Sequence, residues 1–350
     1  MYTEAVRRAA EREPRQFQET GRLAFEGVLG KVYNPRDSLK RLQWERTLVF
    51  DGGGEQGEMT VRCRDPSDDS RLVVRLVPCN HADDVAFLQK EACEIRDTLH
   101  PNLLRVRDVH LHEIERFTHT GTRAERWKLV VISCTFCPGG RLVDELDRMR
   151  SEAMALGKGS MHVRLPVAPE AFRFDEGDPE SVTDTRTAMH QRIAALAEEL
   201  EKWLAQVASG LRALHASGCT HRNLNPGNIY LDERRRAVVG GFQCIKTARA
   251  PGCPTSLGRA DCGSACVIAP EVEDGGVAGT SADIWAFGCC LYRWITGELP
   301  RMRTLPIARA LQRVPHAYSE KIRRVLRMAL EPRPQSRATA DDIWAVLGGK

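Results

Sequence analysis

Two short segments of the chain have residue types and spacings that could do chemistry. The glycine cluster Gly52-Gly53-Gly54-Glu55-Gln56-Gly57 could bring backbone N–H groups close to a phosphate, although the same residues could simply form a hairpin turn. Residues 221–228 read His-Arg-Asn-Leu-Asn-Pro-Gly-Asn, which places three side-chain amides within one short loop. An amide forms hydrogen bonds but takes up no proton at neutral pH, so Asn223 cannot act as a general base.

The first half of the chain has the patterns of β-strands, and the second half has those of helices. Alternating and β-branched residues predict strands at 46–50, 59–63, 72–77 and 127–136. Apolar residues spaced by three and four predict helices at 87–99 and 193–214. Strands first and helices second predict an α+β architecture, with a β-rich lobe and a helical lobe.

Residues 221–228 resemble the catalytic loop of protein kinases, H-R-D-L-x-x-x-N, and the resemblance extends in the family's order over nearly the whole chain from about residue 45. The glycine cluster resembles the glycine-rich loop, Leu72-Val73-Val74-Arg75 resembles V-A-I-K, and Glu91 stands where the family has the glutamate of its third helix. The gatekeeper and hinge, D-F-G, A-P-E and D-x-W-x-x-G motifs are matched, in that order, by Cys134–Cys137, Gly241-Phe242-Gln243, Ala269-Pro270-Glu271 and residues 283–288.

The resemblance implies a bilobal protein-kinase-like fold and a domain organisation. A 1–44 extension would precede a kinase-like domain at 45–350, with an N-lobe at 45–133, a hinge at 134–138 and a C-lobe at 139–350. The stretch 150–188 is polar and irregular, which is typical of a surface insertion or a mobile loop.

Three positions that serve catalysis in this family have changed residue type. Asn223 replaces the base, Gly241 replaces the aspartate that holds Mg²⁺, and Arg75 replaces the lysine on the phosphates. An amide accepts no proton, glycine offers no oxygen to a hard cation, and a guanidinium is not interchangeable with an ammonium group. These changes indicate a pseudokinase without a metal site, which acts as a scaffold or allosteric regulator. Its protein partner would be an active kinase or a large assembly.

The resemblance also assigns residues that shape the fold and residues that would contact a nucleotide. The structural positions are His221, Phe242, Glu271, Asp283 and Arg337, with Arg337 pairing with Glu271 and with Val106 and Ile95 joining His221 and Phe242 in an internal stack. The candidate nucleotide-binding residues are Gly52, Gly54, Gly57, Val73, Arg75, Glu91, Thr135, Cys137, Asn228 and Tyr230. Met59 and Val73 would cover the adenine and Tyr230 would lie beneath it.

Two alternatives to the inactive scaffold stay open at this point. The chain could be an atypical active Ser/Thr kinase that uses ATP through a rebuilt site. It could also be a switch that binds ATP without Mg²⁺ and without catalysis.

Composition narrows the function class further. The chain has 350 residues and a net charge of +4, which is too small to indicate a nucleic-acid partner. It has no apolar run that approaches the roughly 18 residues of a membrane span and no apolar segment of a signal peptide near its start. Twelve cysteines lie mostly in apolar segments, so we expect buried free thiols and a cytoplasmic location.

Overall fold

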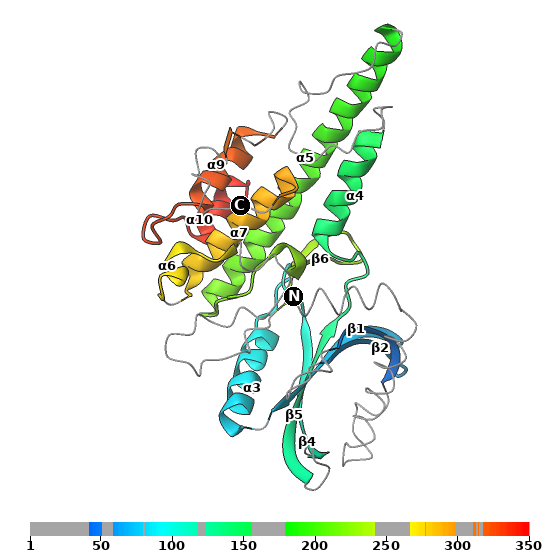
Figure 1. Cartoon of the computed structure of the whole chain (residues 1–350), viewed down its shortest axis with the longest axis vertical. Helices are drawn as coiled ribbons and strands as arrows, with labels where there is room; N and C mark the ends of the chain where they lie inside the picture. Colours follow the sequence, from blue (N-terminus) through cyan, green and yellow to red (C-terminus); the bar gives the residue numbers. More distant parts are fainter. Residues whose placement is uncertain are drawn as a thin grey trace. The chain divides into compact units, whose positions relative to one another are not determined.

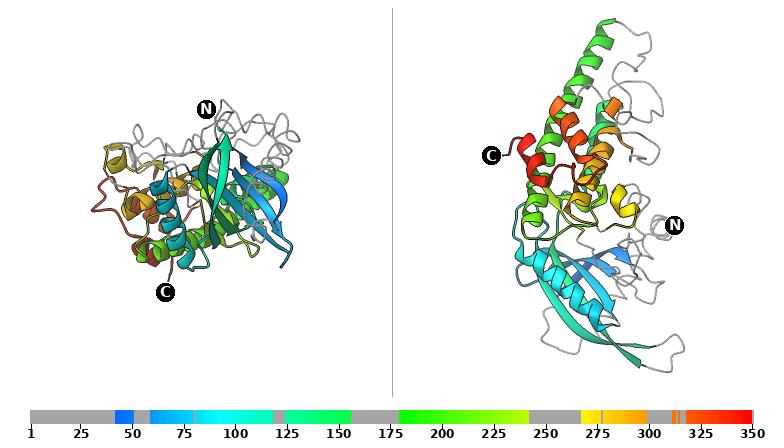
Figure 2. Two further views of the ribbon diagram at one scale, coloured as in Figure 1. Left: turned by 90° about the horizontal axis from the view of Figure 1, so that it is seen from below. Right: turned by 90° about the vertical axis from the view of Figure 1, so that its left-hand side faces the viewer.

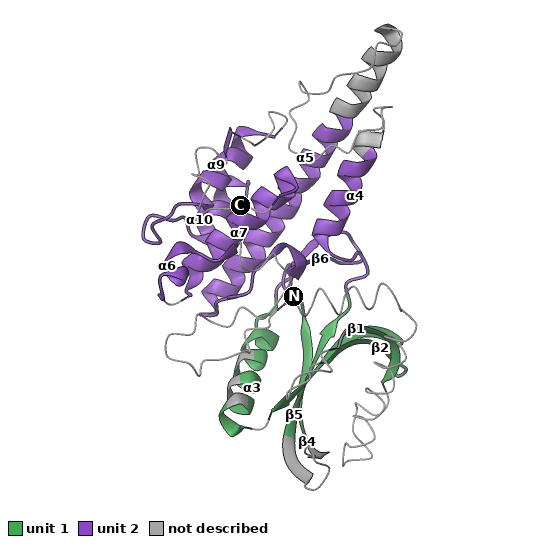
Figure 3. Cartoon of the chain, viewed as in Figure 1, with its two compact units in different colours: residues 1–99, 104–136 green, residues 100–103, 137–350 purple. Residues whose placement is uncertain are grey.

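The computed structural model describes two compact units of the chain. The described residues are 42–50, 59–79, 81–117, 124–155, 179–241, 267–276, 278–298, 311–312, 314 and 318–349. Unit 1 comprises residues 1–99 and 104–136, and unit 2 comprises residues 100–103 and 137–350 (Figure 3). The described part of unit 1 is mainly sheet and that of unit 2 mainly helix, so the predicted α+β class is confirmed.

Unit 1 contains an antiparallel sheet of five strands with the order β1-β2-β3-β5-β4 (Figure 1). The strands are β1 (Gln43–Phe50), β2 (Met59–Asp65), β3 (Ser70–Cys79), β4 (Val106–Phe117) and β5 (Ala124–Thr135). Helix α3 (Ala82–Asp97) connects β3 to β4 and packs along the sheet against β3, β4 and β5 (Figure 2).

The two faces of this sheet differ in character because successive side chains along a strand point to opposite sides. One face, the apolar face, carries a buried cluster of Met59, Val61, Cys63, Leu72, Val74, Leu76, Leu129 and Val131. The other face, the Val73 face, carries Val73 and Arg75, which lie opposite Arg62 and Thr60 of β2. The described α3 side chains are absent from the apolar-face cluster, so α3 lies over the other side of the sheet.

Unit 2 is built on helices, and two of them, α4 (Leu142–Ala155) and α5 (Pro179–Ala216), lie side by side and antiparallel (Figure 1). Its other described α-helices are α6 (Pro270–Glu273), α7 (Thr280–Thr296), α9 (Glu320–Ala329) and α10 (Ala340–Val346). The short helix η3 (Pro226–Asn228) and the hairpin of β6 (Ile229–Leu231) and β7 (Ala237–Val239) follow α5. Helix α5 lies beside α4, α10 and β7, so it is the element around which unit 2 is assembled (Figure 1).

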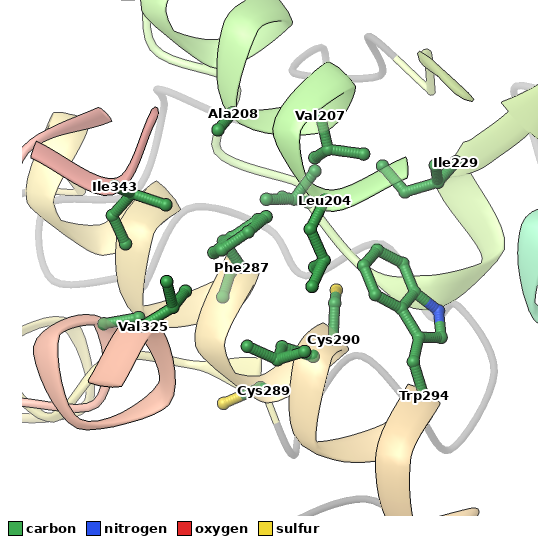
Figure 4. Close-up of a cluster of buried hydrophobic side chains, with 14 of the residues drawn as sticks. Leu204, Val207, Ala208, Ile229, Phe287, Cys289, Cys290, Trp294, Val325 and Ile343 are labelled. Atoms are coloured by element: carbon green, nitrogen blue, oxygen red, sulfur yellow. The ribbon is translucent and has the colours of Figure 1, made fainter. Parts of the chain in front are cut away.

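Helix α7 runs through the core of unit 2. From Asp283 to Thr296 all its residues except Arg293 are buried, and Phe287 and Trp294 project toward α5 residues such as Leu204 (Figure 4). A Cβ on Gly288 would lie 2.8 Å from the Cδ2 of Leu330, so glycine allows the close approach of the segment after α9. Trp203, Trp285 and Trp294 are all buried.

Several predicted boundaries differ from the structure. The stretch 150–188 is helical at both ends, because α4 continues to Ala155 and α5 begins at Pro179; residues 156–178 lie outside the described residues. The sequence did not predict β4, whose alternating residues are mostly charged or His. Most residues of the 1–44 extension, the glycine cluster and residues 242–266 also lie outside the described part.

Two predictions from composition can be compared with the described residues. None of the eight described cysteines is in a disulfide. The expectation of burial holds for Cys63, Cys79, Cys289 and Cys290, and it is wrong for the half-buried Cys93, Cys134, Cys137 and Cys219. Across the described helices, none combines the length and the apolar character needed to cross a bilayer.

Candidate functional site

The loop from His221 to Asn228 is positioned in unit 2 by a single carboxylate on α7. Asp283 Oδ2 accepts a hydrogen bond from the backbone N–H of His221 (2.7 Å), and Oδ1 accepts one from Arg222 (2.8 Å). The Nε2 atom of His215, at the end of α5, lies 2.9 Å from Oδ2. Asp283 is only 1% exposed, so these partners supply the hydrogen bonds that an exposed carboxylate would receive from water.

His221 connects the start of the loop to the segment after β7. Its Nε2 lies 2.8 Å from the carbonyl oxygen of Gly240, and its Nδ1 accepts from the backbone N–H of Asn223 at 3.2 Å. This pattern fits a neutral ring protonated at Nε2. Burial lowers the pKa of His221 and so favours the same neutral form. The negative charge of Asp283 acts in the opposite direction, but its effect is smaller.

Three asparagines form a hydrogen-bonded network within the loop. The side-chain NH₂ groups of Asn225 and Asn228 both donate to the carbonyl oxygen of Asn223, at 3.0 and 2.8 Å. The Asn223 amide in turn donates to the carbonyl oxygen of Gly241 at 3.3 Å, and the Asn225 Oδ1 accepts from the Gly227 N–H at 2.9 Å. A carboxylate at position 223 could not make the bond to Gly241, because it has no hydrogen to donate.

Gly241 occupies a position that resists any other residue. Its φ is +72°, a conformation that L side chains adopt only at a cost. A Cβ at this position would lie 2.1 Å from the Cγ of Asn228, far inside van der Waals contact. Glycine therefore accommodates the Asn228 side chain, and a larger residue would have to displace it.

Glu271 and Arg337 form a buried ion pair in unit 2. The Nη1 and Nη2 atoms of Arg337 donate to the two carboxylate oxygens of Glu271 at 2.6 and 2.9 Å. Nη1 also donates to the Ser281 carbonyl oxygen. Burial raises the pKa of Glu271, but the hydrogen bonds from Arg337 outweigh it, so the pKa is lowered overall. The pair fastens the segment after α9 to the start of α6.

The candidate nucleotide-binding residues of unit 1 do not all share one face of the sheet. Val73 and the half-buried Arg75 lie on the Val73 face of β3. Thr135, exposed at the end of β5, lies opposite Leu72 and so belongs to the apolar face. The side chain of Glu91 and the residues Gly52, Gly54 and Gly57 lie outside the described residues, so the pairing of Arg75 with Glu91 stays a prediction.

The expectation that Met59 and Val73 cover an adenine together is wrong. Met59 lies opposite Leu76, three residues beyond Val73 along β3, and belongs to the apolar-face cluster. Because the side chains of a strand alternate, Met59 and Val73 point to opposite sides of the sheet. The residue of β2 that faces Val73 is Arg62.

The remaining candidates belong to unit 2. Tyr230 is half-buried on β6 opposite Val238, next to Asn228 and its network. Burial, with a further contribution from the Asp232 charge, raises the pKa of the Cys137 thiol to about 12, so it is an unreactive thiol at neutral pH. Phe242 lies outside the described residues, whereas Val106 is buried and Ile95 half-buried in unit 1.

The described residues include no cluster of three or more His, Cys, Asp or Glu side chains that could hold a metal ion. At the position where the resemblance implies a magnesium ligand, Gly241 has no side-chain oxygen to contribute. The residues present at this position therefore do not fit a magnesium site of the kind that the resemblance implies.

Two contributions to the site were not predicted. His215 contacts Asp283, and Asn225 joins Asn223 to Gly227. The only sequence signal for His215 is its place six residues before His221 at the end of a long apolar pattern, which does not distinguish it from a surface histidine.

Comparison with known proteins bears on the same region of the chain. Residues 178–346 match the family model described as the protein kinase domain. The chain is 32% identical over 160 residues to CBL-interacting protein kinase 10 of Oryza sativa subsp. japonica, covering 43% of this chain and 35% of that protein. It is 41% identical over 102 residues to the serine/threonine-protein kinase PDK1 of Cryptococcus neoformans, covering 28% and 8%.

A third relative carries a different description. The chain is 29% identical over 152 residues to the inactive serine/threonine-protein kinase PLK5 of Mus musculus, covering 41% of this chain and 25% of that protein. Among the first relatives, the chain spans between 8% and 35% of their own lengths.

Replacing the Asp283 carboxylate by an amide should destabilise unit 2. In Asp283→Asn one oxygen becomes an NH₂ group that must face the N–H donors of the loop, which should cost about 2–3 kcal/mol. Urea unfolding followed by tryptophan fluorescence measures this loss. The matched control is Asp341→Asn, at an exposed carboxylate that pairs with Arg212 on the surface. If both variants lose equally little stability, the loop does not depend on Asp283.

Acidification should weaken the fold through His221. Its pKa is lowered in the folded protein, so near the ordinary value of 6.5 the unfolded chain binds a proton that the folded chain does not. Stability is therefore retained above this value and lost as the pH falls through it, by at most about 1.4 kcal/mol per pH unit. Urea midpoints between about pH 7.5 and 5.5 should show this slope in the wild type and a flatter one in His221→Phe. The exposed His81→Phe variant serves as the control for replacing a histidine, and a slope in His221→Phe equal to that of the wild type would contradict the assignment.

Proposed function

Residues 178–346 form a domain of the protein kinase superfamily, and from this premise we propose that the chain is a catalytically inactive kinase-like domain that binds another protein. It would act as a scaffold or an allosteric regulator of its partner, an active kinase or a large assembly. The observation that carries the proposal is the hydrogen bond from the Asn223 amide to the Gly241 carbonyl oxygen.

That hydrogen bond involves both positions that the chemistry needs. Phosphoryl transfer requires a carboxylate to accept the proton of the substrate hydroxyl and carboxylate oxygens to hold Mg²⁺. In this chain the first position is an amide used as a donor, and the second is a glycine whose carbonyl accepts that donor. The amide donor of Asn223 and the carbonyl acceptor of Gly241 bond to each other, and neither residue has a carboxylate to offer to a substrate or a metal.

The contacts that shape the domain support a role in binding. Asp283 fixes the backbone of the loop and Arg337 fixes Glu271, so the residues that maintain the fold are in place. A domain that keeps its shape without its reactive groups can still present a surface to a partner. The description of the mouse relative as inactive is consistent with such a use of the scaffold.

A reducing, cytoplasmic compartment is part of this proposal. None of the eight described cysteines is in a disulfide, and Cys63, Cys79, Cys289 and Cys290 are buried. Burial, with the nearby Glu45 charge, raises the pKa of Cys63 to about 12, which keeps this thiol protonated and unreactive. Cysteines that are not in disulfides are typical of proteins that work where thiols are kept reduced.

The purified chain should transfer no phosphate to itself or to generic protein substrates above a blank without protein. The measurement is incorporation of labelled phosphate from ATP with Mg²⁺ or Mn²⁺, compared with Asn228→Ala. Incorporation that is lost in Asn228→Ala would come from the site itself and would refute the proposal. Equal incorporation in both proteins would indicate a contaminating kinase, to be removed before the assay is repeated.

Single repairs of the site should not restore activity. Asn223→Asp returns a base but breaks the bond to Gly241, and Gly241→Asp adds a carboxylate where a Cβ already overlaps Asn228. Because base and metal ligand act as a unit, each repair should leave phosphate incorporation at the blank level. The Gly241→Asp variant should also be less stable than the wild type by about 1–2 kcal/mol from its left-handed backbone alone. Mg²⁺-dependent autophosphorylation of Gly241→Asp would contradict both expectations.

A further inference from the structure

A group of charged side chains lies on the Val73 face of the sheet in unit 1. Arg62 of β2 lies opposite Val73 in the register of the sheet, so the two side chains share a face with their Cβ atoms about 5 Å apart. In the kinase resemblance, Val73 is the residue of β3 that would cover an adenine. The structure therefore places a guanidinium group beside the residue expected to contact the base.

Arg62 is held in this place by two neighbours. Its Nε atom lies 2.8 Å from the Oε2 atom of Glu45, and its guanidinium carbon lies 5.2 Å from the centre of the Phe136 ring. The side chains of Arg62 and Glu45 are 28% and 19% exposed, so the pair is largely shielded from water. A cation above an aromatic ring gains further attraction, and this gain increases as water is excluded.

An irregularity in β1 brings Glu45 to this pair. The register passes from Trp44 opposite Cys63 directly to Arg46 opposite Arg62, which leaves Glu45 with no residue opposite it in β2. Such bulges redirect side chains. The other carboxylate oxygen of Glu45 accepts from Arg71 at 3.3 Å, so one carboxylate neutralises two arginines on this face.

This arrangement does not suit an adenine base. A purine is bound between apolar surfaces, and covering Arg62 with one would remove the remaining water from a paired charge. Displacing Arg62 instead would break its contacts with Glu45 and Phe136 and leave a shielded carboxylate with less compensation. Covering Arg62 and displacing Arg62 both cost free energy, and the contacts of a single base would offset little of that cost.

We propose that Arg62, held by Glu45 and Phe136, occupies the part of the Val73 face where the kinase resemblance would place adenine, and that this side chain excludes purine bases from it. The fold would thus carry an internal substitute for the base. This inference goes beyond the proposed function, since a chain without phosphotransfer could still bind a nucleotide.

The test measures binding of adenosine, which probes the base contacts without requiring Mg²⁺ or a lysine on the phosphates. Saturation-transfer NMR and calorimetry are applied to the full chain as wild type, Arg62→Val and Arg62→Met. The Met variant keeps an unbranched apolar side chain in case valine perturbs β2. The matched control is Arg64→Val, on the same strand and face, where Arg64 forms an exposed pair with Asp69.

The wild type and Arg64→Val should show no saturable binding up to about 5 mM adenosine, whereas a folded Arg62 variant should bind with a Kd lower by roughly tenfold or more. Saturable binding to the wild type that competes with ATP would overturn the proposal. Absence of binding in both Arg62 variants, with thermal melting showing that they are folded, would also overturn it, because Arg62 would not be the obstacle. Either result leaves the phosphotransfer assay to decide the proposed function separately.

Discussion

The carboxylate of Asp283 is the group on which the loop from His221 to Asn228 depends. It lies on the buried helix α7, and it accepts hydrogen bonds from two consecutive backbone N–H groups. The second of these belongs to Arg222, whose φ of +59° is unfavourable for an L residue. The loop keeps this conformation because both N–H groups donate to a buried carboxylate, which is costly to leave without hydrogen bonds. The orientation of His221, and through it the approach of Gly240, follows from that anchor.

The loop shows that the conformation of a site and its chemistry rest on different atoms. Asp283 contacts the loop through backbone atoms, which any sequence at positions 221 and 222 other than proline would supply. The side chains at 223, 225 and 228 can therefore change while the path of the backbone is retained. In this chain all three are asparagines, which supply both donors and acceptors and so bond to one another.

The sequence predicted the class of the fold, helix α5, four of the five strands near their observed bounds and the close pairing of Glu271 with Arg337. It failed where local pattern and tertiary position diverge. Strand β4 has polar residues along much of its length, so its alternation gave no apolar signal. Met59 was assigned to the wrong face because glycine spacing does not set the register of β2 on β3, and one residue of shift reverses every side chain. The bulge at Glu45 was equally invisible, since a bulge has no fixed sequence requirement apart from occasional glycines.

The networks in the two units follow one physical rule, although each forms within its own unit. A polar group that faced a ligand in an occupied site would lose its partner when the ligand is absent, and a shielded polar group without a partner costs free energy. Asn223 avoids that cost by donating to Gly241, and the charge of Arg62 is compensated by the Glu45 carboxylate and the Phe136 ring beside it. Such internal partners stabilise the empty domain, and the same contacts would have to be broken before a ligand could take their place. A chain under no requirement to bind nucleotide would therefore accumulate substitutions of this kind, because each makes the folded state less dependent on a ligand.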